Sequence, residues 1–175
     1  YAGDSSTATV SDDGTVVLSD SDANIQVWGG PEIDYPLSVA ADTELRIVRN
    51  SENSAPATLT VAEDGSLTNN GAITVEEDCA LVLEGGLSQT SGGGTLNCDG
   101  TVKLPPEEDL IALSGADNLT YNGKAQTPTV TVQLNLWDYT QTYILDTDYT
   151  VSYTDATDAG NSALAVVTST GTGDL

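Results

Sequence analysis

Apolar and polar residues alternate in short runs along the first hundred residues, and one such run recurs with small changes. Residues 37–45 read LSVAADTEL, residues 59–67 read LTVAEDGSL and residues 73–81 read ITVEEDCAL. Residues 96–104 (LNCDGTVKL) follow the pattern more loosely, and residues 8–18 (ATVSDDGTVVL) are interpreted as a divergent earlier copy. Each unit predicts a short strand, a turn at the Asp or Gly position, and a second short strand.

Strands and turns in this order predict a small right-handed β-solenoid, in which the apolar positions of each coil lie on those of the coil below. The units start at positions 37, 59, 73 and 96, so we expect coils of unequal length. A β-sandwich is the alternative, because alternating strands with Gly-rich turns fit either fold. The predicted core consists of Val39, Leu45, Leu59, Val61, Leu67, Ile73, Val75, Leu81, Leu83, Leu96, Val102 and Leu104.

The last third of the chain predicts a second all-β region. Residues 129–132 (TVTV) are all β-branched, and residues 163–167 form a short apolar run. In residues 149–153 (YTVSY), two tyrosines and a valine alternate with small polar residues, the period of a half-buried strand. Asn122-Gly123 is a tight-turn dipeptide, because both residues tolerate positive φ. Short strands without a helical period between them predict a small β-sandwich, and packing within it is the expected role of its tyrosines.

Two prolines and three acidic residues at positions 105–109 (PPEED) interrupt the strand pattern. Such a segment is typical of a linker between domains. The predicted organisation is therefore a solenoid-like or sandwich domain over residues 1–104 and a second β-sandwich over residues 110–175.

Residues 119–132 (LTYNGKAQTPTVTV) and 146–160 (DTDYTVSYTDATDAG) resemble the MBG or YDG type of bacterial immunoglobulin-like surface repeat. The resemblance implies an immunoglobulin-like sandwich in a secreted or wall-attached protein of Gram-positive bacteria, and so an extracellular, cell-surface location. The first hundred residues are similar to the solenoid segments of bacterial adhesins. The matching positions of the surface repeat are Tyr121, Asn122, Gly123, Lys124, Pro128, Asp148, Tyr149, Val151, Tyr153, Ala159 and Gly160.

Charge limits the partners that the chain can bind. The sequence has 27 Asp and Glu residues against 4 Lys and Arg residues, a formal net charge of −23. Nucleic acids and anionic membranes are excluded as partners, because so few cations cannot form a basic patch. No stretch approaches the roughly 20 apolar residues that a membrane-spanning helix needs, so we expect no membrane insertion. The same charge favours cations, above all Ca²⁺.

Asp20, Asp22 and Asn24 place oxygen ligands at alternate positions, as the opening of a calcium loop does. Ile25 stands where such a loop needs glycine, so the segment is not an EF-hand; the alternatives are a looser calcium site and a solvated acidic turn. The pairs Asp12-Asp13 and Asp146/Asp148 are further acidic candidates.

Cys79 and Cys98 are the only cysteines, and the chain has no histidine to complete a metal site with them. Because they lie in neighbouring repeat units of a chain expected outside the cell, we predict a disulfide; two separately buried thiols are the alternative. Without histidine, neither a Ser-His-Asp nor a Cys-His arrangement can form, and we expect no enzymatic activity.

Two functions fit these features. The first is a structural or adhesive module on a stalk or in a fibre outside the cell. The second is a carbohydrate-binding module, in which Trp28, Trp137, Tyr139 or Tyr143 stacks on sugar rings. The last three alternate in register with a strand, so we expect them to share one face.

The start of the chain adds an assembly hypothesis to the first function. The sequence reaches Gly171 to Leu175 without the closing strand that the resemblance implies, whereas Thr7, Ala8, Thr9 and Val10 have strand composition. We therefore expect this segment of one subunit to complete the second domain of the next by strand addition, joining copies head to tail. The alternative is that the closing strand follows later in a longer protein.

Overall fold

The computed structural model describes residues 6–20, 25–105, 111–114, 122–154 and 164–170. Within these residues the regular elements are strands, apart from one short 3-10 helix, η1 (Leu87–Gln89). The chain divides into two compact units, Tyr1–Leu110 with Leu136–Tyr139, and Ile111–Asn135 with Thr140–Leu175. The predicted all-β class is confirmed. Of the predicted linker, residues 106–109 lie outside the described residues.

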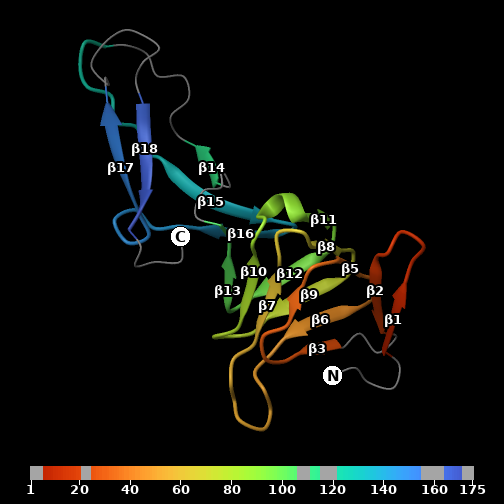
Figure 1. The fold of residues 1–175 in the computed structure, drawn as a ribbon. Helices are drawn as coiled ribbons and strands as arrows, with labels where there is room; N and C mark the ends of the chain where they lie inside the picture. The colour runs from red at the N-terminus through yellow and green to blue at the C-terminus, as the bar shows by residue number, and fades with distance from the viewer. Residues whose placement is uncertain (1–5, 21–24, 106–110, 115–121, 155–163, 171–175) are drawn as a thin grey trace. The chain divides into compact units, whose positions relative to one another are not determined.

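The first unit is a stack of coils, each of which places one strand in each of three sheets (Figure 1). Strands of successive coils pair in parallel, so the chain steps from sheet to sheet and returns to the first sheet one coil further along. This arrangement is solenoid-like, as predicted, and the sandwich alternative for this unit is wrong. In chain order the coils are β2 (Val16–Asp20), β3 (Ile25–Val27) and β4 (Glu32–Ile33); β5 (Pro36–Val39), β6 (Glu44–Ile47) and β7 (Thr58–Val61); β8 (Ser66–Asn69), β9 (Ala72–Val75) and β10 (Ala80–Leu83); and β11 (Thr90–Gly92), β12 (Thr95–Cys98) and β13 (Thr101–Lys103).

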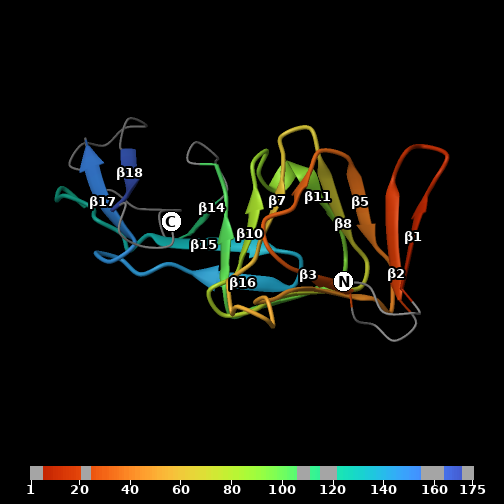
Figure 2. The same ribbon diagram turned by 60° about the horizontal axis from the view of Figure 1, so that its bottom comes forward.

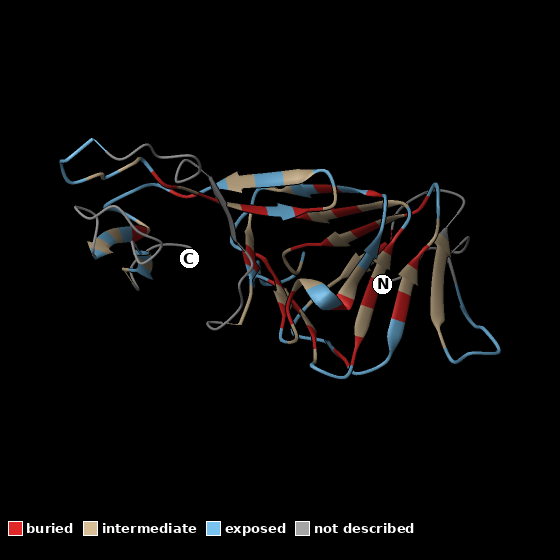
Figure 3. Cartoon of the chain, turned by 90° about the horizontal axis from the view of Figure 1, so that it is seen from above, coloured by how far each residue is buried: buried red, intermediate tan, exposed pale blue. Residues whose placement is uncertain are grey.

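Columns of buried apolar residues form the interior of the stack. Figure 3 shows buried segments, in red, along the strands of the coils. Ile25, Leu45, Ile73 and Leu96 occupy paired positions in one sheet, and all four are buried. Alternate side chains along each strand face outward, since successive residues of a strand point to opposite faces. Each large apolar side chain buried in this way stabilises the fold by about 1.5–3 kcal/mol. Every predicted core position is buried except Leu104, which is half-buried at the end of the last coil.

The recurring sequence unit corresponds to a corner between two sheets and not to a whole coil. Residues 37–45 span β5 and β6, residues 59–67 span β7 and β8, and residues 73–81 span β9 and β10. The same residues recur because each of these corners joins a buried apolar position, a tight polar turn and a second buried position. The intervals between units therefore do not give the coil length. The coil length follows from the strand pairing, in which Leu37 lies beside Leu67 and Leu67 beside Thr90.

Residues 8–18, interpreted as an early copy of this unit, form a hairpin instead. The strand β1 (Ser6–Val10) pairs antiparallel with β2 over its whole length (Figure 2). Gly14 in the turn has φ 86° and Thr15 N donates to Asp13 Oδ1. A tight turn of this kind reverses the chain, whereas the other corners turn it into the next sheet.

The corners allow close approach of one coil to the next. A Cβ atom on Gly71 would lie 2.2 Å from the carbonyl oxygen of Thr43, and one on Gly94 would lie 2.4 Å from that of Gly71. Glycine is therefore required at both positions for steric reasons, because a side chain would displace the backbone of the neighbouring coil.

The described strands of the second unit form small antiparallel assemblies. β14 (Ile111–Ser114), β15 (Thr131–Leu136) and β16 (Tyr139–Thr142) make a three-stranded sheet, and β17 (Tyr149–Thr154) and β18 (Leu164–Ser169) make a hairpin. The predicted strand segments are thus present. The immunoglobulin-like arrangement itself stays a prediction.

Two tyrosines of β17 connect parts of the second unit. The Tyr149 side chain is buried, and its hydroxyl donates to the carbonyl oxygen of Val130 at 2.8 Å. The Tyr153 hydroxyl donates to the carbonyl oxygen of Pro128. The Tyr149 ring is buried, the Tyr153 ring is half-buried and both hydroxyls are bonded within the unit, which agrees with the packing role predicted for these tyrosines.

No helix in the described part of the chain is long and apolar enough to span a membrane.

Candidate functional site

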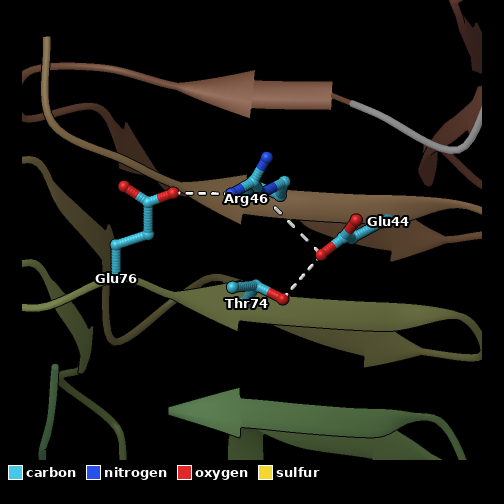
Figure 4. A network of polar contacts seen from close by, with 4 residues as sticks. All are labelled: Glu44, Arg46, Thr74 and Glu76. Atoms are coloured by element: carbon cyan, nitrogen blue, oxygen red, sulfur yellow. Dashed lines mark hydrogen bonds and ion pairs between the residues drawn. The ribbon is translucent and has the colours of Figure 1, made fainter. Parts of the chain in front are cut away.

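The outer face of one sheet carries a polar network that joins two coils (Figure 4). Arg46 Nη2 lies 2.6 Å from Glu76 Oε1, and Arg46 Nε lies 3.8 Å from Glu44 Oε1. Thr74 Oγ1 donates to Glu44 Oε1 at 2.7 Å. Glu44 and Arg46 flank the buried Leu45 in β6, so the alternation of the strand turns both side chains outward.

This network joins two neighbouring coils through ion pairs and a hydrogen bond. One guanidinium bridges two carboxylates from neighbouring coils, and both Arg46 and Glu76 are partly exposed. Pairs in contact with water contribute little individually, at most about 1 kcal/mol. A second ion pair joins Arg49 to Asp78, the corner residue of the next coil. Both arginines of this chain thus neutralise carboxylates of its own solenoid.

The predicted calcium residues are only partly within the described residues. Asp20 ends β2, and its side chain, like Asp22 and Asn24, lies outside the described residues. Among the residues that the structure describes, no cluster of three or more acidic, cysteine or histidine side chains is arranged to hold a metal ion. The calcium site stays a prediction.

The other acidic candidates take part in their own turns. Asp13 accepts a hydrogen bond from Thr15 N, which holds the pKa of its carboxyl below the ordinary value. Asp148 Oδ2 accepts from Ile144 N at 2.7 Å, and Asp146 adopts φ 66° in the same turn. The carboxylates of Asp13 and Asp148 thus each bond to the backbone of their own turn.

The predicted disulfide is wrong: Cys79 and Cys98 are both free thiols. The strand register explains this result, because the two residues lie in different columns. Cys98 lies beside Val75. Cys79 directly precedes Ala80, so its neighbours in the adjacent coils are Ala57 and Gly100, which directly precede the strand partners of Ala80. The alternative of two separate thiols is correct, with Cys79 buried and Cys98 half-buried.

The three aromatic residues expected on one strand face lie in different settings. Trp137 lies in the turn after β15 with φ 54°, Tyr139 begins β16, and Tyr143 follows the end of β16. Tyr143 is buried, whereas Trp137 and Tyr139 are half-buried, as is Trp28 after β3. The indole Nε1 of Trp137 donates to the carbonyl oxygen of Ser91 at 2.9 Å. A flat sugar-binding platform needs exposed coplanar rings, so this placement favours the structural role.

The expected donor strand is engaged by its own chain. Thr7, Ala8, Thr9 and Val10 lie in β1 and pair with Ser19, Leu18, Val17 and Val16 of β2. Val10 keeps 72% of its surface exposed. Donation of this strand to another subunit would therefore require that β1 first separate from β2.

Two buried amides were missed by sequence reasoning. Asn69 lies in the column that Val39 occupies one coil earlier, and its Nδ2 donates to the carbonyl oxygen of Thr95 at 2.9 Å. Gln89 is also buried; its Nε2 donates to the carbonyl oxygen of Gly65 at 3.0 Å, and its Oε1 accepts from Gly85 N at 2.8 Å. The signal in the sequence is an amide residue shortly before a glycine turn: Asn69 precedes Gly71, and Gln89 precedes Gly92.

Comparison with protein-family models, with curated proteins and with solved structures gives no match to this chain. The similarity to bacterial surface repeats therefore stays an expectation from the sequence.

Proposed function

We propose that this chain is a structural or adhesive module of an extracellular, cell-surface protein, and that it acts without enzymatic activity. Its partners are copies of itself or other domains of the same surface. The observation that carries the proposal is the continuous stacking of apolar columns through the coils of the first unit. A stack of this kind can bear force along its axis, because each coil is hydrogen-bonded to the next in three sheets.

The corner contacts support the same role. Asn69 and Gln89 connect successive coils through side-chain hydrogen bonds, and Arg46 connects them on the outer face. Buried and fully bonded amides of this type make one packing arrangement far more favourable than its alternatives. A rigid spacer or adhesive scaffold needs this property.

The excess of acidic residues fits an exposed location. A formal charge of −23 keeps such a surface soluble and repels other anionic surfaces. It also favours partners that carry cations, including glycans or proteins bridged by Ca²⁺.

Localisation on intact cells tests the proposal. An antiserum raised against the folded chain should label unpermeabilised cells of the source organism, and external protease should remove the label. A cytosolic protein in the same cells serves as the control for leakage. Labelling that requires permeabilisation would overturn the surface location.

A binding assay with the same chain separates adhesion from sugar recognition. Beads coated with the chain should adhere to host or sibling cells, and a glycan array should give no strong specific signal. The aromatic substitution Tyr139→Ala, compared with the exposed Tyr35→Ala, is the matched pair. If a specific glycan bound the wild type and Tyr139→Ala alone abolished binding, the carbohydrate-binding alternative would replace the structural one.

A further inference from the structure

One turn of the chain makes three side-chain contacts with the last coil of the solenoid. Leu136–Tyr139 belongs to the first unit. Trp137 Nε1 donates to the carbonyl oxygen of Ser91 in β11 at 2.9 Å, and Asp138 Oδ1 accepts from Leu96 N in β12 at 2.8 Å. Tyr139 forms a side-chain hydrogen bond with Cys98. Three consecutive residues thus bond to two neighbouring edge strands.

The backbone amide that Asp138 binds lies on the free side of β12. Thr95 N donates to Gly71 O and Asp99 N donates to Val75 O, so both amides point toward the preceding coil. Amides alternate in direction along a strand, and Leu96 N therefore points away from that coil. β12 is the last strand of its sheet in the described residues. Such an edge offers unpaired groups to any further strand.

We infer that the turn Leu136–Tyr139 is an edge cap, and that it excludes the solenoid of a second copy from pairing with β12. The carboxylate of Asp138 already accepts the hydrogen bond of the Leu96 amide, a donor that a further strand would need. The indole of Trp137 adds a hydrogen bond from the same turn to the carbonyl oxygen of Ser91 in β11. In a chain with a formal charge of −23, a carboxylate at this edge also repels an approaching copy.

A second copy is the occupant that the edge fits best. β3 lies at the opposite end of the same sheet as β12 and is the last strand there among the described residues. Ile25 of β3 lies in the same apolar column as Leu96 of β12. A copy placed head to tail would therefore continue both the hydrogen-bond ladder and the column without a change of register.

The test removes the cap without changing the strands. The double variant Trp137→Phe/Asp138→Ala, called the capless variant, keeps an aromatic ring at position 137 but removes the indole donor and the carboxylate acceptor. We expect the Leu96 amide to exchange with solvent about tenfold faster, measured by NMR. We also expect the weight-average mass in sedimentation to rise with concentration above that of the wild type. Asp64→Ala, at an exposed corner, removes one negative charge elsewhere and should change neither measurement.

A third variant separates edge pairing from partial unfolding. Gln26→Pro removes the outward amide of β3, the opposite edge strand. Val48 N donates to Val27 O, so Val27 faces the next coil, and the Gln26 amide, one residue earlier in the strand, points away from that coil. Added to the capless variant, Gln26→Pro should return the mass toward that of the wild type. The inference is overturned if the capless variant shows no faster Leu96 exchange, if its mass does not rise, or if Gln26→Pro leaves the association unchanged.

Discussion

The side-chain amide of Asn69 donates from Nδ2 to the carbonyl oxygen of Thr95, 2.9 Å away in the next coil, while its Oδ1 accepts from Gly71 N at 3.2 Å. The side chain has no exposed surface. One buried residue thereby satisfies backbone groups of two successive corners. This contact is the most direct link between a single side chain and the stacking of the coils.

Asn69→Ala should therefore lower the free energy of unfolding by about 1–3 kcal/mol, because it leaves buried backbone groups without partners. The neighbouring Asn70 is exposed, and Asn70→Ala is the matched control with an expected change within about 0.5 kcal/mol. Urea denaturation followed by circular dichroism measures both. Equal effects of the two substitutions would contradict the role assigned to Asn69.

Gly94→Ala should destabilise the solenoid, whereas Gly93→Ala should not. A Cβ atom at position 94 would lie 2.4 Å from Gly71 O and 2.5 Å from Asn69 Oδ1, while one at position 93 would meet nothing within 4 Å. Overpacking of this kind costs about 1–3 kcal/mol. Thermal melting of the two variants under identical conditions checks the difference, and a stable Gly94→Ala protein would show that the corners can move apart.

Arg46→Met should reduce stability by about 1 kcal/mol or less, because the side chain contacts water as well as its carboxylate partners. The loss should shrink as salt concentration rises, since exposed charge interactions are screened. A double-mutant cycle with Glu76→Gln isolates the pair. A coupling that does not depend on salt would indicate packing of the methylene groups and not charge.

The cysteines should titrate as two thiols in the denatured, non-reduced chain. In the folded chain Cys79 should resist alkylation, because it is buried. Burial raises the pKa of the Cys98 thiol, so Cys98 should react slowly at neutral pH and faster as the pH rises. A mass two hydrogens below that of the reduced chain would instead restore the disulfide.

The raised pKa of Cys98 also sets a direction for stability. The folded state favours the neutral thiol, so this contribution is present below the pKa of the unfolded chain and is lost as the pH rises through the folded value. In Cys98→Ser, the free energy of unfolding should therefore fall less between neutral and alkaline pH than it does in the wild type. Denaturation at neutral and alkaline pH measures this change.

Tyr149→Phe should destabilise the second unit by about 0.5–1.5 kcal/mol, because it removes a buried hydrogen bond to Val130 and keeps the ring. Tyr35→Phe, at a residue with 40% exposure in the first unit, is the control. Hydrogen exchange resolved by residue is the suitable measurement, since two units need not unfold together. Loss of protection in β17 alone is the expected pattern.

The strands and most of the core could be predicted from local pattern. An inward apolar position next to an outward polar one specifies a strand wherever it occurs, and the positions so identified are buried in the structure except Leu104. The recurrence of similar units in the sequence predicts a solenoid more strongly than a sandwich. The pattern did not reveal that β1 turns back on β2, since a corner and a hairpin turn use the same Asp and Gly residues.

Contacts between distant residues could not be read from the sequence. Cys79 and Cys98 lie in neighbouring coils as expected, but a small difference in register places them in separate columns. Trp137 alternates correctly with Tyr139 in the sequence, yet a residue with φ 54° belongs to a turn and not to a strand. Its partner Ser91 is far away along the chain.

The all-β class, the inward apolar positions, the glycine-rich corners and the acidic surface follow from local period and composition, so they can be predicted from the amino-acid order. The neighbours of each column, the inward direction of two amides and the edge that the turn Leu136–Tyr139 covers can be seen only in the folded chain. These depend on the register between coils, and register is set by the packing of all strands together.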